Sequence, residues 1–195
     1  MIFEDSAPSD EDLMAGIAGN DAEAFEILVR RHRRRILNLI HRSLGGDRTQ
    51  AEDVAQEVFL RVWRSAKDYT PRAKFTTWIY RITVNLCLDA IKSAHYRQSF
   101  IHPEELLERA AGEEGPAGER ATSPEDLLID AEETGRILAV LQELPTNQRL
   151  AVVLKKFDGL SYEEISRILG CSVPAVESLL IRGKKALREK LLSQG

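Results

Sequence analysis

The chain has 195 residues, of which 43% are hydrophobic and 30% are charged, so most of it can fold into one large or two small domains. Its formal net charge of −4 does not by itself favour a nucleic-acid-binding protein. Cys87 and Cys171 are too far apart in sequence to form a ligand cluster, the acidic N-terminus does not resemble a signal peptide, and no uncharged apolar run could span a membrane. These features favour a reduced, cytoplasmic protein without membrane insertion.

The charges are unevenly distributed along the chain. Residues 1–29 hold eight acids and no Lys or Arg, and residues 103–133 hold eleven acids against two arginines, which gives that segment a net charge of −9. In contrast, residues 30–42 carry six arginines and no acid, and residues 70–97 carry five basic residues against one acid. This asymmetry indicates a polyanionic partner for the basic segments.

The N-terminal part of the chain predicts one helical domain over residues 20–98. Residues 1–19 are interpreted as an acidic extension outside this domain. The first helix is expected to begin near Asn20 or Asp21 and to end near Ser43, because apolar side chains fall on one helical face between these points.

Two further helices complete this domain. Thr49 and Glu52 have the spacing of a capping box, and apolar residues then recur at helical spacing over residues 51–63. A loop at residues 69–74 leads into a third helix over residues 76–94.

The third helix carries a stripe of side chains that suits unpaired nucleic-acid bases. Trp78, Arg81, Asn85 and Lys92 lie along it at spacings of three, four and seven residues. An aromatic ring stacks on bases, cations hold phosphates, and an amide reads a base edge. On these residues alone, core aromatics beside solvated surface cations explain the stripe equally well.

A flexible acidic linker is predicted over residues 99–123, because this segment is poor in apolar and rich in charged residues. A second domain is predicted over residues 124–195. Its helices are expected at about residues 125–143, 147–157, 162–169 and 173–192. The fold class is therefore all-α, with two small helical domains joined by a flexible acidic linker.

The last two helices predict a helix-turn-helix. Ser161 and Glu164 form a capping box, Gly170 ends the first helix, and Ser172 caps the second. Basic residues follow the second helix, which suits a helix that enters a DNA major groove. An ordinary helical hairpin in a bundle is the alternative for this segment.

Three segments of the chain resemble the sigma-70 family of bacterial RNA polymerase sigma factors. Residues 75–85, FTTWIYRITVN, resemble the promoter-melting segment, and residues 51–63 resemble the polymerase-docking helix. Leu144-Pro145 together with residues 159–170 resembles the C-terminal DNA-binding domain. The segments occur in the family's order, and two domains joined by a linker resemble the extracytoplasmic-function (ECF) group.

The resemblance implies a sigma factor that binds the β′ and β subunits of core RNA polymerase, recognises the −10 and −35 elements of promoter DNA, and promotes melting. An anti-sigma factor is a further expected partner. The implied polymerase-docking residues are Asp53, Gln56, Glu57 and Arg61. The implied −10 contacts are Arg72, Lys74, Thr77, Trp78, Arg81, Asn85 and Lys92. The implied −35 contacts are Ser172, Pro174, Ala175, Glu177, Ser178, Arg182, Lys184 and Lys185.

The recognition helix departs from the family's pattern. Glu177 and Leu179 stand where many members have basic residues. We therefore expect Arg182, Lys184 and Lys185 to hold phosphates, while Glu177 either accepts a hydrogen bond from a cytosine amino group or lies on the solvated surface.

Two other functions are compatible with parts of the chain. A conventional helix-turn-helix regulator that binds only duplex DNA is the main alternative, although it requires neither the helix at 51–63 nor the segment at 75–89. An enzyme is not favoured, because the four histidines form no ligand set and no nucleophile motif or phosphate-binding glycine loop is present. We expect no catalytic residues, metal or cofactor.

Overall fold

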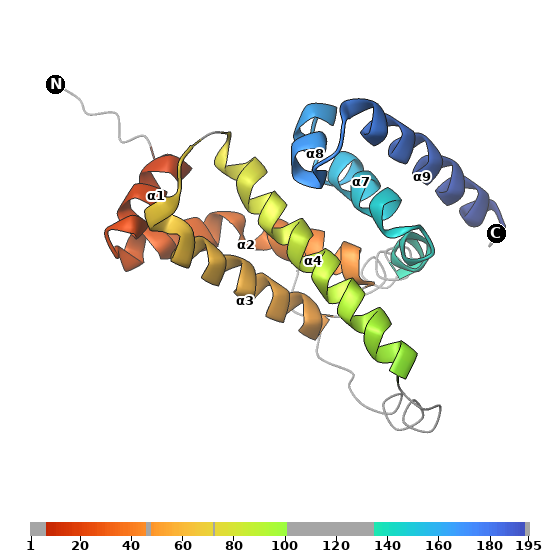
Figure 1. The fold of residues 1–195 in the computed structure, drawn as a ribbon, viewed down its shortest axis with the longest axis horizontal. Helices are drawn as coiled ribbons and strands as arrows, with labels where there is room; N and C mark the ends of the chain where they lie inside the picture. The colour runs from red at the N-terminus through yellow and green to blue at the C-terminus, as the bar shows by residue number, and fades with distance from the viewer. Residues whose placement is uncertain (1–6, 46–47, 72, 101–134, 194–195) are drawn as a thin grey trace, which may run out of the picture.

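The computed structural model describes residues 7–45, 48–71, 73–100 and 135–193. All regular structure within these ranges is helical, which confirms the predicted all-α fold class (Figure 1). None of the helices that it describes is both long and apolar enough to cross a membrane. The predicted linker lies outside the described residues from residue 101 onward.

The N-terminal domain contains four α-helices and one 3₁₀ turn: α1 (Asp10–Ala18), α2 (Ala22–Leu44), α3 (Arg48–Ser65), η1 (Ala66–Asp68) and α4 (Phe75–Phe100). The expected start of α2 is confirmed, because the carboxylate of Asp21 accepts hydrogen bonds from the amides of Glu23 and Ala24 at 2.9 and 3.1 Å. α4 continues to Phe100, past the expected end of the helix at residue 94 and of the domain at residue 98.

The expected cap of α3 is wrong. Arg48 is already helical, so the hydroxyl of Thr49 lies within the first turn rather than ahead of it, where an N-cap oxygen accepts from the first amides. Glu52 does not close a capping box and instead accepts from Nε of Arg48 at 3.5 Å. The apolar spacing, and not the cap, predicted this helix correctly.

The expectation that residues 1–19 form an extension outside the domain is also corrected. Residues 10–18 form α1, which packs against α2 and η1. Its acids lie in the first turn, where negative charge stabilises a helix, so an acidic composition is compatible with helix formation. The residues that this helix buries in the core are Leu13, Met14 and Ile17.

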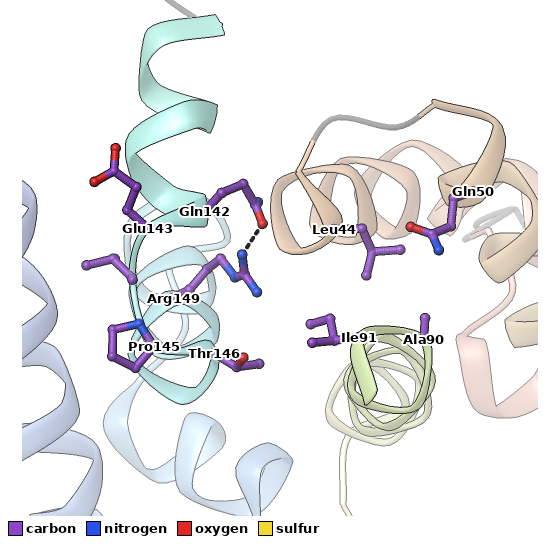
Figure 2. A pocket seen from close by; sticks show the side chains of 10 residues that line it. Leu44, Gln50, Ala90, Ile91, Gln142, Glu143, Pro145, Thr146 and Arg149 are labelled. Atoms are coloured by element: carbon purple, nitrogen blue, oxygen red, sulfur yellow. Dashed lines mark hydrogen bonds between the residues drawn. The ribbon is translucent and has the colours of Figure 1, made fainter. Parts of the chain in front are cut away.

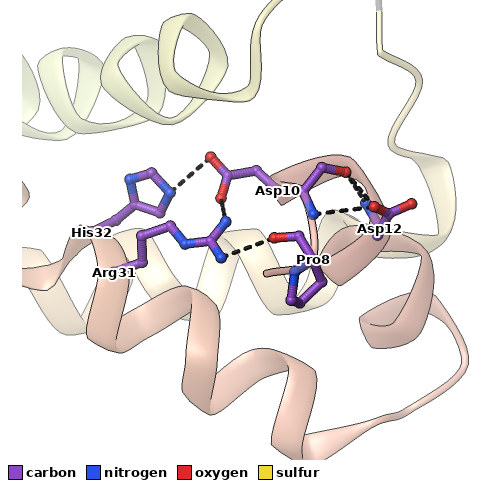
Figure 3. A network of polar contacts seen from close by, with 6 residues as sticks. Pro8, Asp10, Asp12, Arg31 and His32 are labelled. Carbon is purple, nitrogen blue, oxygen red and sulfur yellow. Dashed lines mark hydrogen bonds and ion pairs between the residues drawn. The ribbon is translucent and has the colours of Figure 1, made fainter. Parts of the chain in front are cut away.

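A polar network attaches α1 to α2 (Figure 3). Oδ1 of Asp10 accepts from Arg31 at 2.5 Å, and Oδ2 of Asp10 lies 3.0 Å from Nε2 of His32. Arg31 also donates to the carbonyl oxygen of Pro8 at 2.9 Å. The His32 ring is buried and lies 5.2 Å from the ring of Phe75, so the network reaches the first residue of α4.

The C-terminal domain consists of helical residues 135–142 followed by α7 (Thr146–Lys156), α8 (Tyr162–Leu169) and α9 (Val173–Ser193). The predicted helix-turn-helix is confirmed, since Ser161 and Glu164 form a capping box and Gly170 ends α8 with a φ of 66°. The expected helix at 125–143 lies outside the described residues up to 134. α7 and α9 pack closely at Gly183, where an added Cβ would lie 2.8 Å from Val152.

The two domains pack against each other, α8 on α4 and α7 on α2. Oη of Tyr80 donates to Oδ1 of Asp158 at 2.9 Å, and the guanidinium of Arg42 lies 4.3 Å from the centre of the Phe157 ring. Nε2 of Gln142 donates to the carbonyl oxygen of Arg42 at 3.3 Å. We call this contact region, defined by these five residues, the interdomain seam.

Candidate nucleic-acid interface

A pocket of about 540 Å³ opens between α3, the segment after η1, and α4. Thr77, Trp78 and Arg81, three of the predicted −10 contacts, line this pocket. The side chain of Thr77 is buried, that of Trp78 is half-buried, and that of Arg81 is exposed. The structure therefore brings an aromatic ring and a solvated cation to one opening.

Aromatic packing fixes the position of Trp78. Its ring lies 4.9 Å from that of Tyr69 and 5.6 Å from that of Phe75, in edge and tilted arrangements. The hydroxyl of Tyr69 is buried and has no hydrogen-bond partner among the described residues. Burial raises the pKa of Tyr69, and the nearby charges of Glu11 and Asp10 raise it further. A neutral, pre-positioned aromatic pair of this kind presents a stacking surface for a base.

The other predicted −10 contacts are not in this pocket. Asn85 and Lys92 are exposed further along α4. Lys74 is exposed and forms an ion pair with Glu164 of α8, at 3.6 Å. Arg72 lies outside the described residues. The stripe predicted from the sequence therefore runs along the surface of α4, and the pocket lies at its N-terminal end.

The predicted −35 contacts lie on α9 and at the residue that caps it. Oγ of Ser172 accepts from the amide of Ala175 at 3.4 Å, as expected for a cap. Ala175 is half-buried, whereas the other members of the set are exposed: Ser172, Pro174, Glu177, Ser178, Arg182, Lys184 and Lys185. Val176 and Leu180 face the domain core. Nε of Arg182 donates to the carbonyl oxygen of Ser178 at 3.2 Å, which directs the guanidinium along the exposed face.

The predicted docking residues lie on α3, although not all on one surface. Asp53 and Gln56 are exposed, and Gln56 lines a hollow of about 330 Å³ between α2 and α3. Glu57 accepts from Nε of Arg61 at 3.0 Å. Arg61 lines the pocket that contains Trp78, so it points towards the predicted −10 side of α3.

Comparison with known proteins decides the family. Residues 28–96 match the family description "Sigma-70 region 2", and residues 134–187 match "Sigma-70, region 4". The chain belongs to the sigma-70 family. Within that family it falls in the ECF group, because relatives named as ECF sigma factors match over nearly the whole chain.

Two relatives and two solved structures define this similarity. The ECF RNA polymerase sigma-E factor of Escherichia coli K12 is 31% identical over 94% of each chain, and SigE of Mycolicibacterium smegmatis is 38% identical over 94% of this chain and 70% of its own. A structure of CnrH in complex with the cytosolic domain of CnrY superposes with a TM-score of 0.69 at 28% identity, covering 96% of this chain and all of that one. The structure of the sigma factor RpoE of Bartonella quintana, in complex with the anti-sigma factor NepR, superposes with a TM-score of 0.62 at 20% identity. The match covers 87% of this chain and 98% of the RpoE chain, and it supports the fold.

Three residues of this sigma factor at the candidate interface were not identified from the sequence. Tyr69 is the first residue of the loop at residues 69–74, and an aromatic residue beside the basic residues of that loop is a signal that the sequence contains. Ile181, which is 61% exposed among the cations of α9, breaks the polar pattern of a solvated face and is also visible in the sequence. Arg167 of α8 lines the Trp78 pocket from the other domain, and no local pattern predicts such a contact.

Among the described residues, no group of three or more His, Cys, Asp or Glu side chains is arranged to hold a metal ion.

Proposed function

We propose that this sigma factor binds core RNA polymerase through the β′ and β subunits, directs it to promoters with −10 and −35 elements, and promotes their melting. One observation carries the proposal. The same chain presents an aromatic and cationic pocket on one domain and an exposed helix-turn-helix on the other. These two surfaces suit a single-stranded and a duplex element respectively.

At the −10 element, the pocket of α4 would receive a base extruded from the duplex. Trp78 and Tyr69 supply the stacking surface, and Arg81 lies beside them to contact the adjacent phosphate. Extrusion costs a few kcal/mol of lost stacking and pairing, which stacking in a pocket offsets. Thr77 lines the same pocket, and the remaining −10 contacts, Arg72, Lys74, Asn85 and Lys92, would hold the strand along α4 and the loop before it.

At the −35 element, α9 would enter the major groove. Its first turn and exposed face carry Ser172, Pro174, Ala175, Glu177 and Ser178 toward base edges. Arg182, Lys184 and Lys185 follow as phosphate contacts. The exposed Ile181 lies beside these cations, and an apolar side chain there suits the methyl group of thymine.

For polymerase docking, we propose the exposed face of α3 that carries Asp53, Gln56 and Glu57. Leu60 on the same helix is 45% exposed and lines the hollow beside Gln56. A large apolar side chain ringed by polar groups is typical of a protein contact surface. The position of Arg61 suggests a contribution to the −10 pocket in addition to docking.

The proposal includes a regulatory partner and a place of action. A solved relative is bound to the cytosolic domain of another protein, so we expect an anti-sigma factor to bind this chain. Because its proposed partners are polymerase and promoter DNA, we place its action in the cytoplasm. It would work as a specificity subunit, without catalysis of its own.

The decisive experiment reconstitutes transcription from purified core polymerase and a genomic promoter library, with and without this chain. The proposal predicts initiation at a discrete set of promoters that share two spaced elements. The absence of stimulation at every promoter, together with intact duplex binding, would instead support the duplex-only regulator. Asp53→Arg should abolish core binding, whereas Glu26→Arg, the same type of charge reversal on the exposed surface of α2, should not.

A further inference from the structure

A buried guanidinium that has no acidic partner among the described residues lies beside the interdomain seam. The side chain of Arg149 on α7 is only 5% exposed. Its Nη1 donates to Oε1 of Gln142, which is a neutral group, and its Nε has no hydrogen-bond partner among the described residues (Figure 2). Buried charges in proteins are normally paired, because an unpaired one has lost its hydration without compensation.

The nearest candidate counter-charges do not neutralise Arg149. Glu143 lines the same cavity, but its carboxylate is paired with Lys190 of α9. Cys87 interacts electrostatically with Arg149, yet burial raises the pKa of its thiol to about 12, so it carries no charge at neutral pH. Burial also lowers the pKa of Arg149 itself, which is the direction expected for a guanidinium that lacks an anion.

A cavity of about 550 Å³ adjoins this guanidinium. Arg149 and Gln142 project from one wall, and Leu44 and Ile91 project from the opposite wall, which the other domain supplies (Figure 2). α7 begins at the same cavity with Pro145 as its N-cap, a residue whose side chain makes no capping hydrogen bond. The positive end of the helix dipole therefore adds to the charge of Arg149.

We propose that this cavity is a binding site for an organic acid, whose carboxylate pairs with Arg149. A guanidinium matches a carboxylate with two parallel hydrogen bonds, and the cavity has the volume of a small-molecule site. Leu44 and Ile91 suit a short apolar body behind the carboxylate. Because both domains line the cavity, the ligand stabilises the arrangement in which they are packed together.

The test compares benzoate with benzamide, which has the same shape without the charge. The full-length protein is titrated with each, and binding is followed by amide chemical shifts at Thr146 and by thermal shift. Benzoate should bind saturably and benzamide should not. Arg149→Gln should weaken benzoate binding about tenfold or more, because it removes a charged hydrogen-bond donor. Lys156→Gln, on the exposed side of the same helix, should leave binding unchanged.

Two further experiments separate lost binding from misfolding, and the protein's own carboxylates from a free acid. Ala90→Phe fills the cavity from α4 without altering the guanidinium, so it should block benzoate even if Arg149→Gln does not fold. In a chain whose acids at residues 103–133 are replaced by amides, tighter benzoate binding would identify the protein's own carboxylates as competitors. Unchanged binding would identify a free acid. Three results would overturn the proposal. The first is equal binding of benzoate and benzamide, and the second is benzoate binding that persists in both Arg149→Gln and Ala90→Phe. The third is the lack of saturable benzoate binding to both the native chain and the chain with the amide substitutions.

Discussion

We predict that the hydrogen bond between Tyr80 and Asp158 stabilises the packing of the two domains. Tyr80 is 4% exposed, and its hydroxyl donates a hydrogen bond to Oδ1 of Asp158 at 2.9 Å. Oδ2 of Asp158 is buried and has no hydrogen-bond partner among the described residues. Tyr80→Phe removes the donor and leaves the carboxylate under-satisfied at the seam.

The expected effect follows from the charge of the acceptor. Removing a hydrogen bond to a charged group costs about 2 kcal/mol, within the range measured for such bonds. The separated domains expose Asp158 to water and do not incur this cost. The ratio of packed to separated molecules should therefore fall by about 30-fold, since about 1.4 kcal/mol corresponds to a factor of ten.

The same contact predicts a pH dependence. Burial raises the pKa of Asp158 above 3.8, although the hydrogen bond from Tyr80 and the charges of Arg42 and Arg35 lower it. The packed state therefore binds the proton more tightly, so packing strengthens as the pH falls through the packed-state pKa toward 3.8 and weakens as the pH rises. The hydrogen bond with the Ser161 backbone lowers the pKa of Glu164 below 4.5 in packed and separated domains alike, because both residues cap α8, so only the smaller lowering by Lys74 of the other domain acts in the opposite sense. Asp158→Asn should abolish only the first effect.

The assay measures the distance between spin labels on the two domains. Lys67→Cys and Lys184→Cys place labels at exposed sites, with Cys171→Ser removing the half-buried thiol. Cys87 can remain, because it is buried and its raised thiol pKa keeps it unreactive. Tyr80→Phe should populate longer distances, and the same substitution in an Asp158→Asn background should have a smaller effect, because a neutral amide costs less to leave without a donor.

Two results would refute this reasoning. An unchanged distance distribution in Tyr80→Phe would show that the hydrogen bond contributes nothing to domain packing. Equal effects of Tyr80→Phe with Asp158 intact and in the Asp158→Asn background would show that lost packing of the phenol ring, and not the carboxylate, explains the opening.

Three further predictions test other parts of the molecule. Trp78→Ala should reduce promoter opening more than duplex binding, and an equal loss on a pre-melted template would show that the ring is structural. Deleting residues 103–122 should increase DNA affinity at low salt and have little effect at high salt, because screening weakens competition from the acidic segment; no gain in low-salt binding would contradict this. Gly183→Ala should lower the free energy of unfolding by about 1–3 kcal/mol, as overpacking does, because its Cβ would meet Val152; chemical denaturation measures this, and Gly135→Ala, in open space, is the control.

Local patterns in the sequence predicted the elements whose determinants are local. The capping box at Ser161 and the break at Gly170 depend on residues within four positions, and both occur as expected. Helix α1 is not among the elements predicted from the sequence, because the acidic residues 1–19 are interpreted there as an extension. Its apolar residues Leu13, Met14 and Ile17 have helical spacing, and that pattern was the better guide.

Contacts between distant segments were not predictable in this way. The spacing that placed Trp78 on a stripe could not show that Tyr69 packs against it or that Arg167 comes from the other domain. Arg149 is the clearest case. In the sequence it is one cation among many, and only the packing of α7 against the N-terminal domain shows that it is buried, with no acidic partner in the part of the chain that the structure describes.

When the two domains are packed together, the proposed −35 surface is exposed, whereas residues of the proposed −10 surface contact the other domain. On α9, Ser178 and Arg182 are exposed, so duplex contacts there require no change in domain packing. On the other side, Lys74 is paired with Glu164, and Arg167 of the same helix borders the Trp78 pocket. A strand whose phosphate binds Lys74 must displace a carboxylate that repels it. Duplex recognition is therefore compatible with packed domains, whereas capture of the melted strand favours their separation, which the seam contacts oppose.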